Sequence, residues 1–294
     1  MGGAWLQFVA GGLTAGAIYA LVALGFSILY NASHAINFAQ GEFVMAGGMS
    51  AVSLVGMGLP LWAAVPLAVA AAALVGLLVQ RLALEPAQAG GRADVVTLII
   101  ITIGVSLFLR GAAQVLWDKG IHPLPSFSGS TPITVGGASI VPQSLWVLGG
   151  TALAVLVLAW FFNRTLYGKA MRAAAVNPLA AQLMGVSTRG VMRTSFALAG
   201  ALGALGGVLT APITFTAYDV GVMLGLKGFA AAMLGGLGSF GGAVAGGLLL
   251  GLLESFGAGV ISSAYKDALA FVVILAVLFL MPGGLVGARR TERV

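Results

Sequence analysis

The stretch FAAAMLGGLGSFGGAVAGGLLLGLLES, residues 229–255, is apolar enough to lie within a bilayer but is interrupted throughout by glycine. This pattern predicts two short helices around a turn near Gly238–Gly242. A break in a membrane helix is tolerated only where protein or a cavity covers the backbone groups that it frees. The stretch therefore predicts a helical membrane protein with a discontinuous or re-entrant hairpin, and it indicates a transport path.

The composition of the whole chain excludes an ordinary soluble domain. Of its 294 residues, 7% are charged and 60% are hydrophobic, and the mean hydropathy is +1.06. We expect an all-α bundle of about 8–9 membrane helices that forms a single transmembrane domain over residues 1–294. The expected spans are 5–30, 38–57, 61–80, 95–117, 142–162, 191–211 and 268–287, with the Gly-rich region at 228–262.

Lysine and arginine predict the orientation of these spans. The segment 163–193 holds five basic residues and no acid, and three more arginines lie in 289–293, so both segments are expected in the cytoplasm. The loop with Arg81 and Arg92 then also lies inside, and residues 118–141 lie outside. The net charge of +6 is dispersed between apolar stretches, so it does not indicate nucleic-acid binding. The absence of cysteine excludes disulfides and thiolate metal sites.

Small residues recur every four positions in three segments, which predicts close helix packing on one face. The alternative function of these glycines is flexibility for gating. The residues are Gly12, Gly16 and Ala20, then Ala199, Gly203 and Gly207, then Gly238, Gly242 and Gly246.

Enzymatic chemistry has little support in the sequence. No metalloprotease, nucleophile-elbow or phosphate-binding-loop motif is present, so energised work would draw on an ion gradient or on another subunit. His34 and Glu42 at most suggest an acid and a base. Two charged residues are expected within spans: Arg110, which can snorkel to the outer surface, and Glu254, which is either a structural partner or lines a path.

A short helix is predicted in RAAAVNPLAAQLMGV, residues 172–186. Asn177 is a suitable N-cap, Pro178 suits the first helical position, and Gly185 is a natural stop. The helix is too short to cross a membrane. Its apolar face would consist of Leu179 and Leu183, with Ala180 and Met184 beside them.

Two environments would cover this apolar face. One is a groove in a partner protein. The other is the lipid interface, to which nearby basic residues would draw the helix. Those residues are Arg164, Lys169 and Arg172.

Five segments in order resemble the permease subunits of branched-chain amino acid ABC importers, specifically the H-type subunit. The resemblance covers nearly the whole chain. The segments are GLTAGAIYALVALGFSILY (12–30), INFAQGEFVMAGG (36–48), GKAMRAAAVNPLAAQLMGV (168–186), LKGFAAAMLGGLGSFGGAVAGGLLLGLLES (226–255) and YKDALAFVVILAVLFLMPGGLVG (265–287).

The resemblance implies a subunit of an importer in the bacterial inner membrane, with its C-terminus in the cytoplasm, rather than an enzyme. It implies a related second permease that forms a heterodimer, two cytoplasmic ATPases that bind ATP and Mg²⁺, and a periplasmic binding protein. This chain would hold no cofactor. Branched-chain amino acids are the default substrate, while urea and short amides are alternatives. The leading alternative from another class is an ion-coupled secondary transporter.

The resemblance also implies roles for particular residues. The helix from Asn177 to Gly185, in the cytoplasmic segment 163–190, would couple the permease to the ATPases, with Arg172 assisting. Lys227, Lys266 and Asp267 would anchor helix ends or dock the binding protein. Polar candidates for the path are Thr102, Ser106, Ser195, Thr210 and Glu254.

One further helix start is predicted from INFAQGE. Asn37 and Gln40 form a capping-box pattern, and Glu42 follows in the first turn, where the helix dipole favours an acid. We therefore expect the second span to begin at this point.

Overall fold

A computed structural model describes residues 2–89, 94–129, 131–135, 137–260, 262–281 and 283–286. It confirms an all-α polytopic bundle, with one short hairpin of two antiparallel strands. The elements are α1 (Gly2–Ser33), α2 (Gln40–Gly56), α3 (Leu61–Val79), a π-helical turn (Gln80–Leu84), α4 (Glu85–Ala89), α5 (Val95–Trp117), β1 (Ile133–Val135), β2 (Ala138–Ile140), α6 (Pro142–Arg164), α7 (Leu166–Val176), α8 (Pro178–Leu183), α9 (Thr188–Thr214), α10 (Val220–Gly235), α11 (Phe240–Val260), a 3₁₀ turn (Ser263–Tyr265) and α12 (Lys266–Leu280).

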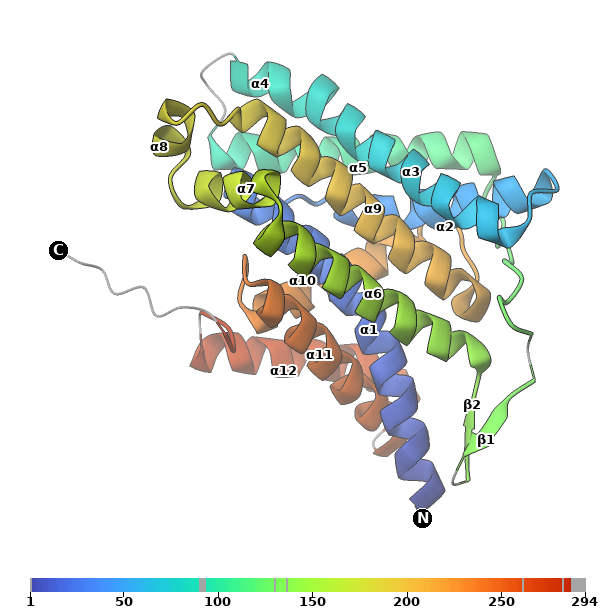
Figure 1. Cartoon of the computed structure of the whole chain (residues 1–294). Helices are drawn as coiled ribbons and strands as arrows, with labels where there is room; N and C mark the ends of the chain where they lie inside the picture. Colours follow the sequence, from blue (N-terminus) through green and yellow to red (C-terminus); the bar gives the residue numbers. More distant parts are fainter. Residues whose placement is uncertain are drawn as a thin grey trace.

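Helix α1 lies at the centre of the bundle and packs along α9, α10 and α11. Helix α9 packs in turn along α2 and α3, so these two long helices hold the remaining elements together (Figure 1). The most apolar window of α1 is 89% buried, whereas that of α5 is 17% buried. Helix α5 therefore lies at the periphery, where its apolar side chains face lipid or a partner subunit.

Each span expected from the sequence overlaps a helix, although α12 ends at Leu280 and not at residue 287 as expected. Six helices in the described part of the chain are long and apolar enough to cross a membrane. They lie within Ala4–Ser33, Leu61–Gln88, Val95–Trp117, Pro142–Arg164, Thr188–Thr214 and Phe240–Val260. Helices α2, α10 and α12 are shorter, with 17, 16 and 15 residues. The Gly-rich stretch forms α10 and α11, which are joined by residues 236–239.

Glycines bring helix backbones into close approach at the centre of the bundle. A Cβ atom at Gly16 would lie 2.8 Å from Cα of Leu248 on α11, and one at Gly12 would lie 2.9 Å from Cα of Leu252. Further along the chain, a Cβ atom at Gly207 on α9 would collide with the carbonyl oxygen of Val44. The two helix pairs α1–α11 and α2–α9 are therefore packed too closely for any side chain at these positions.

The remaining predicted glycines lie at two kinds of position. On α9, a Cβ atom at Gly203 would lie 2.8 Å from Cβ of Phe43, and side chains at Gly242 and Gly246 would collide with backbone atoms of α10. Gly238, by contrast, lies in the turn before α11 with φ of +86°, a conformation that favours glycine. Asn31 donates a hydrogen bond of 2.8 Å to its carbonyl oxygen.

Side-chain caps determine where several helices begin. Asp94 accepts hydrogen bonds from the hydroxyl and the backbone N–H of Thr97, at 2.6 and 2.9 Å, and these bonds hold the pKa of Asp94 below its ordinary value. The predicted capping box before α2 is wrong. The side-chain oxygen of Asn37 accepts a hydrogen bond from the backbone N–H of Ala39, which does not cap α2. Gln40 donates to the carbonyl of Ala199 on α9, so tertiary packing uses the side chain that the capping box would need.

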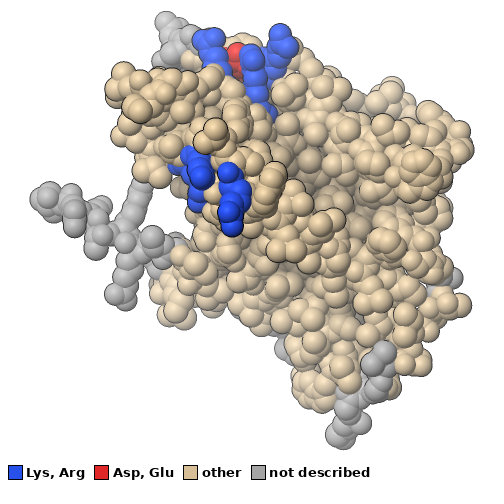
Figure 2. All heavy atoms as spheres, viewed as in Figure 1, with Lys and Arg blue, Asp and Glu red and all other residues tan. Residues whose placement is uncertain are grey.

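Basic side chains gather at one end of the molecule, which we call the basic end. It is formed by the end of α3, the end of α6, α7 and the start of α9, and the blue atoms in Figure 2 lie toward the upper left of the visible face. Its exposed members are Arg81, Arg164, Lys169, Arg172 and Arg189. Arg92 and the C-terminal arginines lie outside the described residues.

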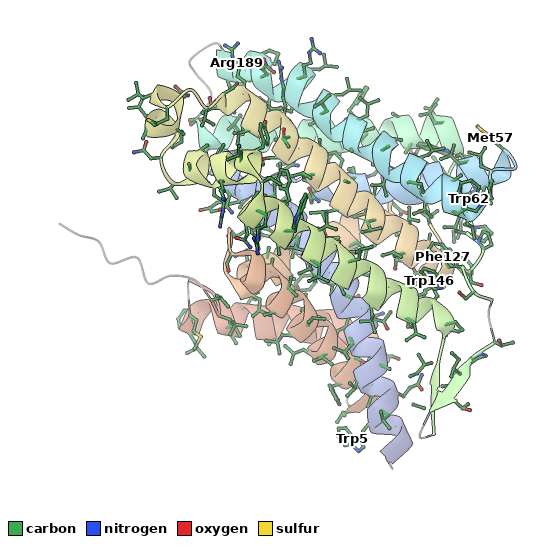
Figure 3. All side chains as sticks on the ribbon, viewed as in Figure 1. Trp5, Met57, Trp62, Phe127, Trp146 and Arg189 are labelled. Atoms are coloured by element: carbon green, nitrogen blue, oxygen red, sulfur yellow. The ribbon has the colours of Figure 1, made fainter. Side chains whose placement is uncertain are left out.

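The opposite end, which we call the far end, holds the loop between α2 and α3 and the strand hairpin. Figure 3 places Met57 and Trp62 across the molecule from Arg189. The hairpin is tied to α1 because Gln7 exchanges two hydrogen bonds with the backbone of Ser139, at 2.7 and 2.9 Å. The molecule thus has two chemically distinct ends, separated by apolar helices.

The glycine contacts generate a first prediction. Gly207→Ala should lower the melting temperature of the detergent-solubilised protein, because a forced separation of α2 and α9 costs about 1–3 kcal/mol. The matched control is Gly149→Ala on α6, since nothing lies within 4 Å of a Cβ atom there. Heating followed by size-exclusion chromatography measures the melting temperatures of both variants. An unchanged melting temperature for Gly207→Ala would contradict the tight packing.

Candidate functional site

The predicted short helix is present at the basic end as α8. Asn177 accepts a hydrogen bond of 3.0 Å from the backbone N–H of Ala180, and Pro178 is the first helical residue. The helix ends at Leu183, Met184 is its C-cap, and Gly185 has φ of +84°. These local signals were readable from the sequence, although the helix has six residues rather than about eight.

The apolar face of α8 points away from the protein. Leu179, Leu183 and Met184 are 68%, 81% and 84% exposed, whereas Ala181 on the other side is buried. In water such side chains are uncovered apolar surface, which favours contact with another molecule. Arg172 on α7 donates a hydrogen bond of 3.0 Å to Asn163, so its side chain is held beside the end of α6.

A second candidate site lies deep between α2 and α5. Glu42 accepts hydrogen bonds through one carboxylate oxygen, Oε1, from Ser106 at 2.8 Å and from Arg110 Nη2 at 2.9 Å. The Glu42 side chain is 2% exposed and that of Arg110 is 28% exposed. This partly buried ion pair joins two helices that are far apart in sequence.

A pocket of about 190 Å³ opens beside this ion pair. Its walls come from α1, α2, α5 and α10, and α2 and α10 approach closely because Gly41 lies against Gly221 and Gly225. The apolar side chains in the wall are Phe26, Phe38, Ile103, Leu107, Leu226 and Phe229. A space of this size admits a small solute rather than a single water molecule.

A second buried ion cluster joins α1, α10, α11 and α12. Lys227 donates to Glu254 at 2.8 Å and to the hydroxyl of Tyr19 at 3.2 Å, and it pairs with Asp267 at 2.7 Å. Tyr19 donates a hydrogen bond of 2.6 Å to the other oxygen of Glu254. The ammonium of Lys227 therefore has three protein partners, and this cluster fastens four helices to one another.

The five polar residues predicted for the path are not brought together. Ser106 lines the pocket beside Glu42, while Thr102, one turn away, is occupied by hydrogen bonds to the backbone of Phe38 and Ile99. Ser195 and Thr210 lie on α9 in two separate pockets. Glu254 belongs to the ion cluster of Lys227.

Sequence reasoning missed that Arg110 pairs with Glu42. It treated Arg110 as a residue that snorkels and Glu42 as a helix-start acid. The two residues are 68 positions apart, so no local pattern links them. The available signal was that two spans, separated in sequence by one other span, each carry a single charge of opposite sign within apolar surroundings.

These features define a polytopic membrane protein with a mostly apolar pocket beside a buried ion pair and an exposed apolar helix at one end. Residues 8–278 match the family described as branched-chain amino acid transport system / permease component, and the chain belongs to that family. Membership makes it a membrane transport subunit rather than an enzyme.

Three curated relatives are similar over most of their length. The high-affinity branched-chain amino acid transport system permease protein BraD of Pseudomonas aeruginosa is 33% identical, covering 99% of this chain and 98% of that protein. LivH of Escherichia coli K12, with the same descriptive name, is 34% identical over the same shares. The probable branched-chain amino acid transport permease protein LivH of Methanocaldococcus jannaschii is 29% identical, covering 91% and 88%.

The Lys227 cluster generates a second prediction. Lys227→Met should strongly lower the melting temperature, because removing one partner of a buried ion pair costs about 3–5 kcal/mol. Adding Glu254→Gln should restore part of the loss, since the remaining buried group is then neutral. Thermal unfolding in detergent followed by tryptophan fluorescence measures these shifts.

The matched control for Lys227 is Lys266→Met. Lys266 is half exposed and lies 3.8 Å from the same Glu254 oxygen, so its loss should cost at most about 1 kcal/mol. Equal shifts for Lys227→Met and Lys266→Met would contradict a fastening role for the buried cluster.

Proposed function

We propose that this chain is one of two related permease subunits in an ATP-driven importer of branched-chain amino acids. The single observation that carries the coupling part of the proposal is α8, a capped helix whose apolar face is exposed at the basic end. Similarity to branched-chain amino acid permeases over 99% of the chain supports the substrate class.

In this proposal α8 docks into a groove on a cytoplasmic ATPase subunit. Asn177, Pro178 and Gly185 hold its geometry, while Leu179, Leu183 and Met184 enter the groove. Arg172 and the other basic residues around it favour contact with acidic groups at the groove edge or with lipid phosphates. ATP and Mg²⁺ bind to the ATPases, and this chain needs no cofactor of its own.

The same proposal assigns an orientation and a helix count. The basic end and the C-terminus face the cytoplasm, in keeping with the positive-inside rule. With α2, α10, α11 and α12 counted as membrane elements, the bundle has nine membrane helices among the described residues, and α10 with α11 forms the Gly-rich hairpin. The far end then receives the binding protein.

The translocation path is proposed to run beside α5. Its exposed apolar surface suits contact with a second permease, which would make the two subunits a heterodimer with the path between them. Ser106 lines a pocket on this side, which supports its role in the path. Thr102 supports the wall from one turn away, while Ser195, Thr210 and Glu254 lie elsewhere.

Docking through α8 generates the third prediction. In tagged protein purified from native membranes, the double variant Leu179→Asp and Leu183→Asp should lose the ATPase subunits, because charges cannot enter an apolar groove without a large desolvation penalty. The second permease should still accompany it. Mass spectrometry of the purified complex measures both.

The control for this variant is Met57→Asp with Ile121→Asp. Both side chains are exposed, at 76% and 72%, and both lie outside the basic end. This control should keep the ATPases. Retention of the ATPases by the α8 variant would contradict the coupling role, and a wild-type protein that purifies alone would overturn the importer assignment.

The energy source generates the fourth prediction. Vesicles that contain the complete complex should accumulate leucine only with ATP, and an ionophore that collapses the proton and sodium gradients should leave the initial rate unchanged. Isoleucine and valine should compete for uptake, whereas urea and acetamide in excess should not. Gradient-dependent uptake without ATP would favour a secondary transporter instead.

A further inference from the structure

We propose that Glu42, Ser106 and Arg110 form a binding site inside the membrane for the charged head of an α-amino acid. Arg110 would bind the carboxylate, Glu42 would accept from the ammonium group, and the apolar wall of the pocket would surround the side chain. This inference deepens the proposed function and rests on it, because a membrane-buried site for a zwitterion needs a partner subunit rather than lipid across its open side.

The depth of the site is the first argument. Ser106 is the middle residue of the 23-residue helix α5, and Arg110 follows one turn later. An ion pair at this depth is expensive, and charged groups in membrane spans face an interior cavity and serve function. Arg110 is held inward by Glu42 at 2.9 Å instead of snorkelling to the surface.

Unused hydrogen-bonding capacity is the second argument. Ser106 and Arg110 both donate to Oε1 of Glu42, and the other carboxylate oxygen, Oε2, is buried without a partner. The guanidinium of Arg110 bonds only through Nη2 within the described residues, and its Nε is also buried without a partner. Buried groups left unpaired are costly, so a ligand that pairs them is favoured.

The Lys227 cluster differs from this pair in how the charge of its basic side chain is shared. The ammonium of Lys227 has three protein partners, which are Glu254, Asp267 and Tyr19. Arg110 and Glu42 both line the pocket of about 190 Å³, and each has one unpaired buried atom. The Glu42–Arg110 pair therefore has capacity for a ligand at the wall of a pocket.

Charge complementarity identifies the ligand class. The ion pair offers one cation and one anion side by side, and a zwitterion presents the opposite charges at a similar separation. A carboxylate suits the planar donor fork of arginine, and an ammonium group donates to a carboxylate oxygen. Because the site and the ligand are each neutral overall, binding adds no net charge to the membrane interior.

The apolar wall adds a preference for aliphatic side chains. Phe26, Phe38 and Phe229 lie on one side of the pocket, and Ile103 and Leu107 come from α5. Phe229 packs against both other rings, with centroids 5.5 and 6.1 Å apart. This wall offers no hydrogen bond to a polar side chain, so leucine, isoleucine and valine suit it better than glutamine or serine.

Binding of radiolabelled leucine to the purified membrane complex, washed free of binding protein, tests the site and is the fifth prediction. Leucinamide lacks the carboxylate, and 4-methylpentanoate lacks the amine, so each removes one proposed contact. Wild-type protein should prefer leucine over either analogue by about 10- to 100-fold, the range expected for a hydrogen bond to a charged group.

Variants assign the two contacts. Arg110→Gln should abolish the preference for leucine over leucinamide, and Glu42→Gln should abolish the preference for leucine over 4-methylpentanoate, whereas Arg110→Lys should retain part of the carboxylate preference. The matched control is Arg193→Gln, which breaks another Arg–Glu pair, to Glu85 at 2.8 Å, outside the pocket. Arg193→Gln should leave both preferences intact. If Glu42 and Arg110 had a purely structural role, their variants would instead weaken the binding of leucine, leucinamide and 4-methylpentanoate alike.

The outcomes separate the two proposals. If the wild-type complex contains the ATPases but binds leucine and leucinamide equally, or if Arg110→Gln keeps the wild-type preference, the zwitterion site is overturned and the importer assignment stands. If no ATPase accompanies the wild-type chain, the importer assignment fails first. Loss of each preference in its own variant, with an unchanged control, supports the site.

Discussion

Close approach between helix backbones at glycine is the interaction on which this structure depends. Inside a bilayer the lipid tails are as apolar as the helices, so association gains little from hiding apolar surface and depends on van der Waals contact. Gly12 and Gly16 allow α11 to lie directly against α1, and Gly203 and Gly207 do the same for α2 against α9. The polar sites follow, because Gly41 against α10 forms the wall beside Glu42.

The two buried ion clusters have different roles in our proposal: the Lys227 cluster stabilises the fold, and the Glu42–Arg110 pair binds a ligand. Lys227 pairs with Glu254 and Asp267 and so joins helices that are consecutive in the chain. Glu42 and Arg110 leave atoms unpaired beside α5, a helix that has little cover from its own subunit. Because Glu42 and Arg110 line a pocket with these atoms unpaired, the pair has a second purpose in our proposal.

The sequence predicted what local chemistry determines. Apolar length predicted the spans, and Asn177, Pro178 and Gly185 predicted α8 because each acts on its own neighbours. Prediction from the sequence failed where a side chain bonds to a residue far away along the chain. Gln40 was expected to cap α2 but bonds to Ala199, 159 positions away, and Arg110 was not linked to Glu42, since periodicity carries no information on which helices meet.

The packing also provides a physical route from α8 to the pocket. Gln182 on α8 donates to Thr188 at the start of α9, at 2.9 Å, and Tyr167 on α7 bonds to Thr194, at 3.0 Å, so α8 and α9 are joined at the basic end. Helix α9 then holds α2 through Gln40 and through the glycine contacts with Phe43 and Val44. Contacts this tight do not deform gradually, so we expect α9 and α2 to move together as a body. Glu42 lies on α2 whereas Arg110 lies on α5, which has few contacts with its own subunit. In the proposed importer, a pull on α8 would therefore change the separation between the two charged groups, which is where a step driven by ATP would grip or release a zwitterion.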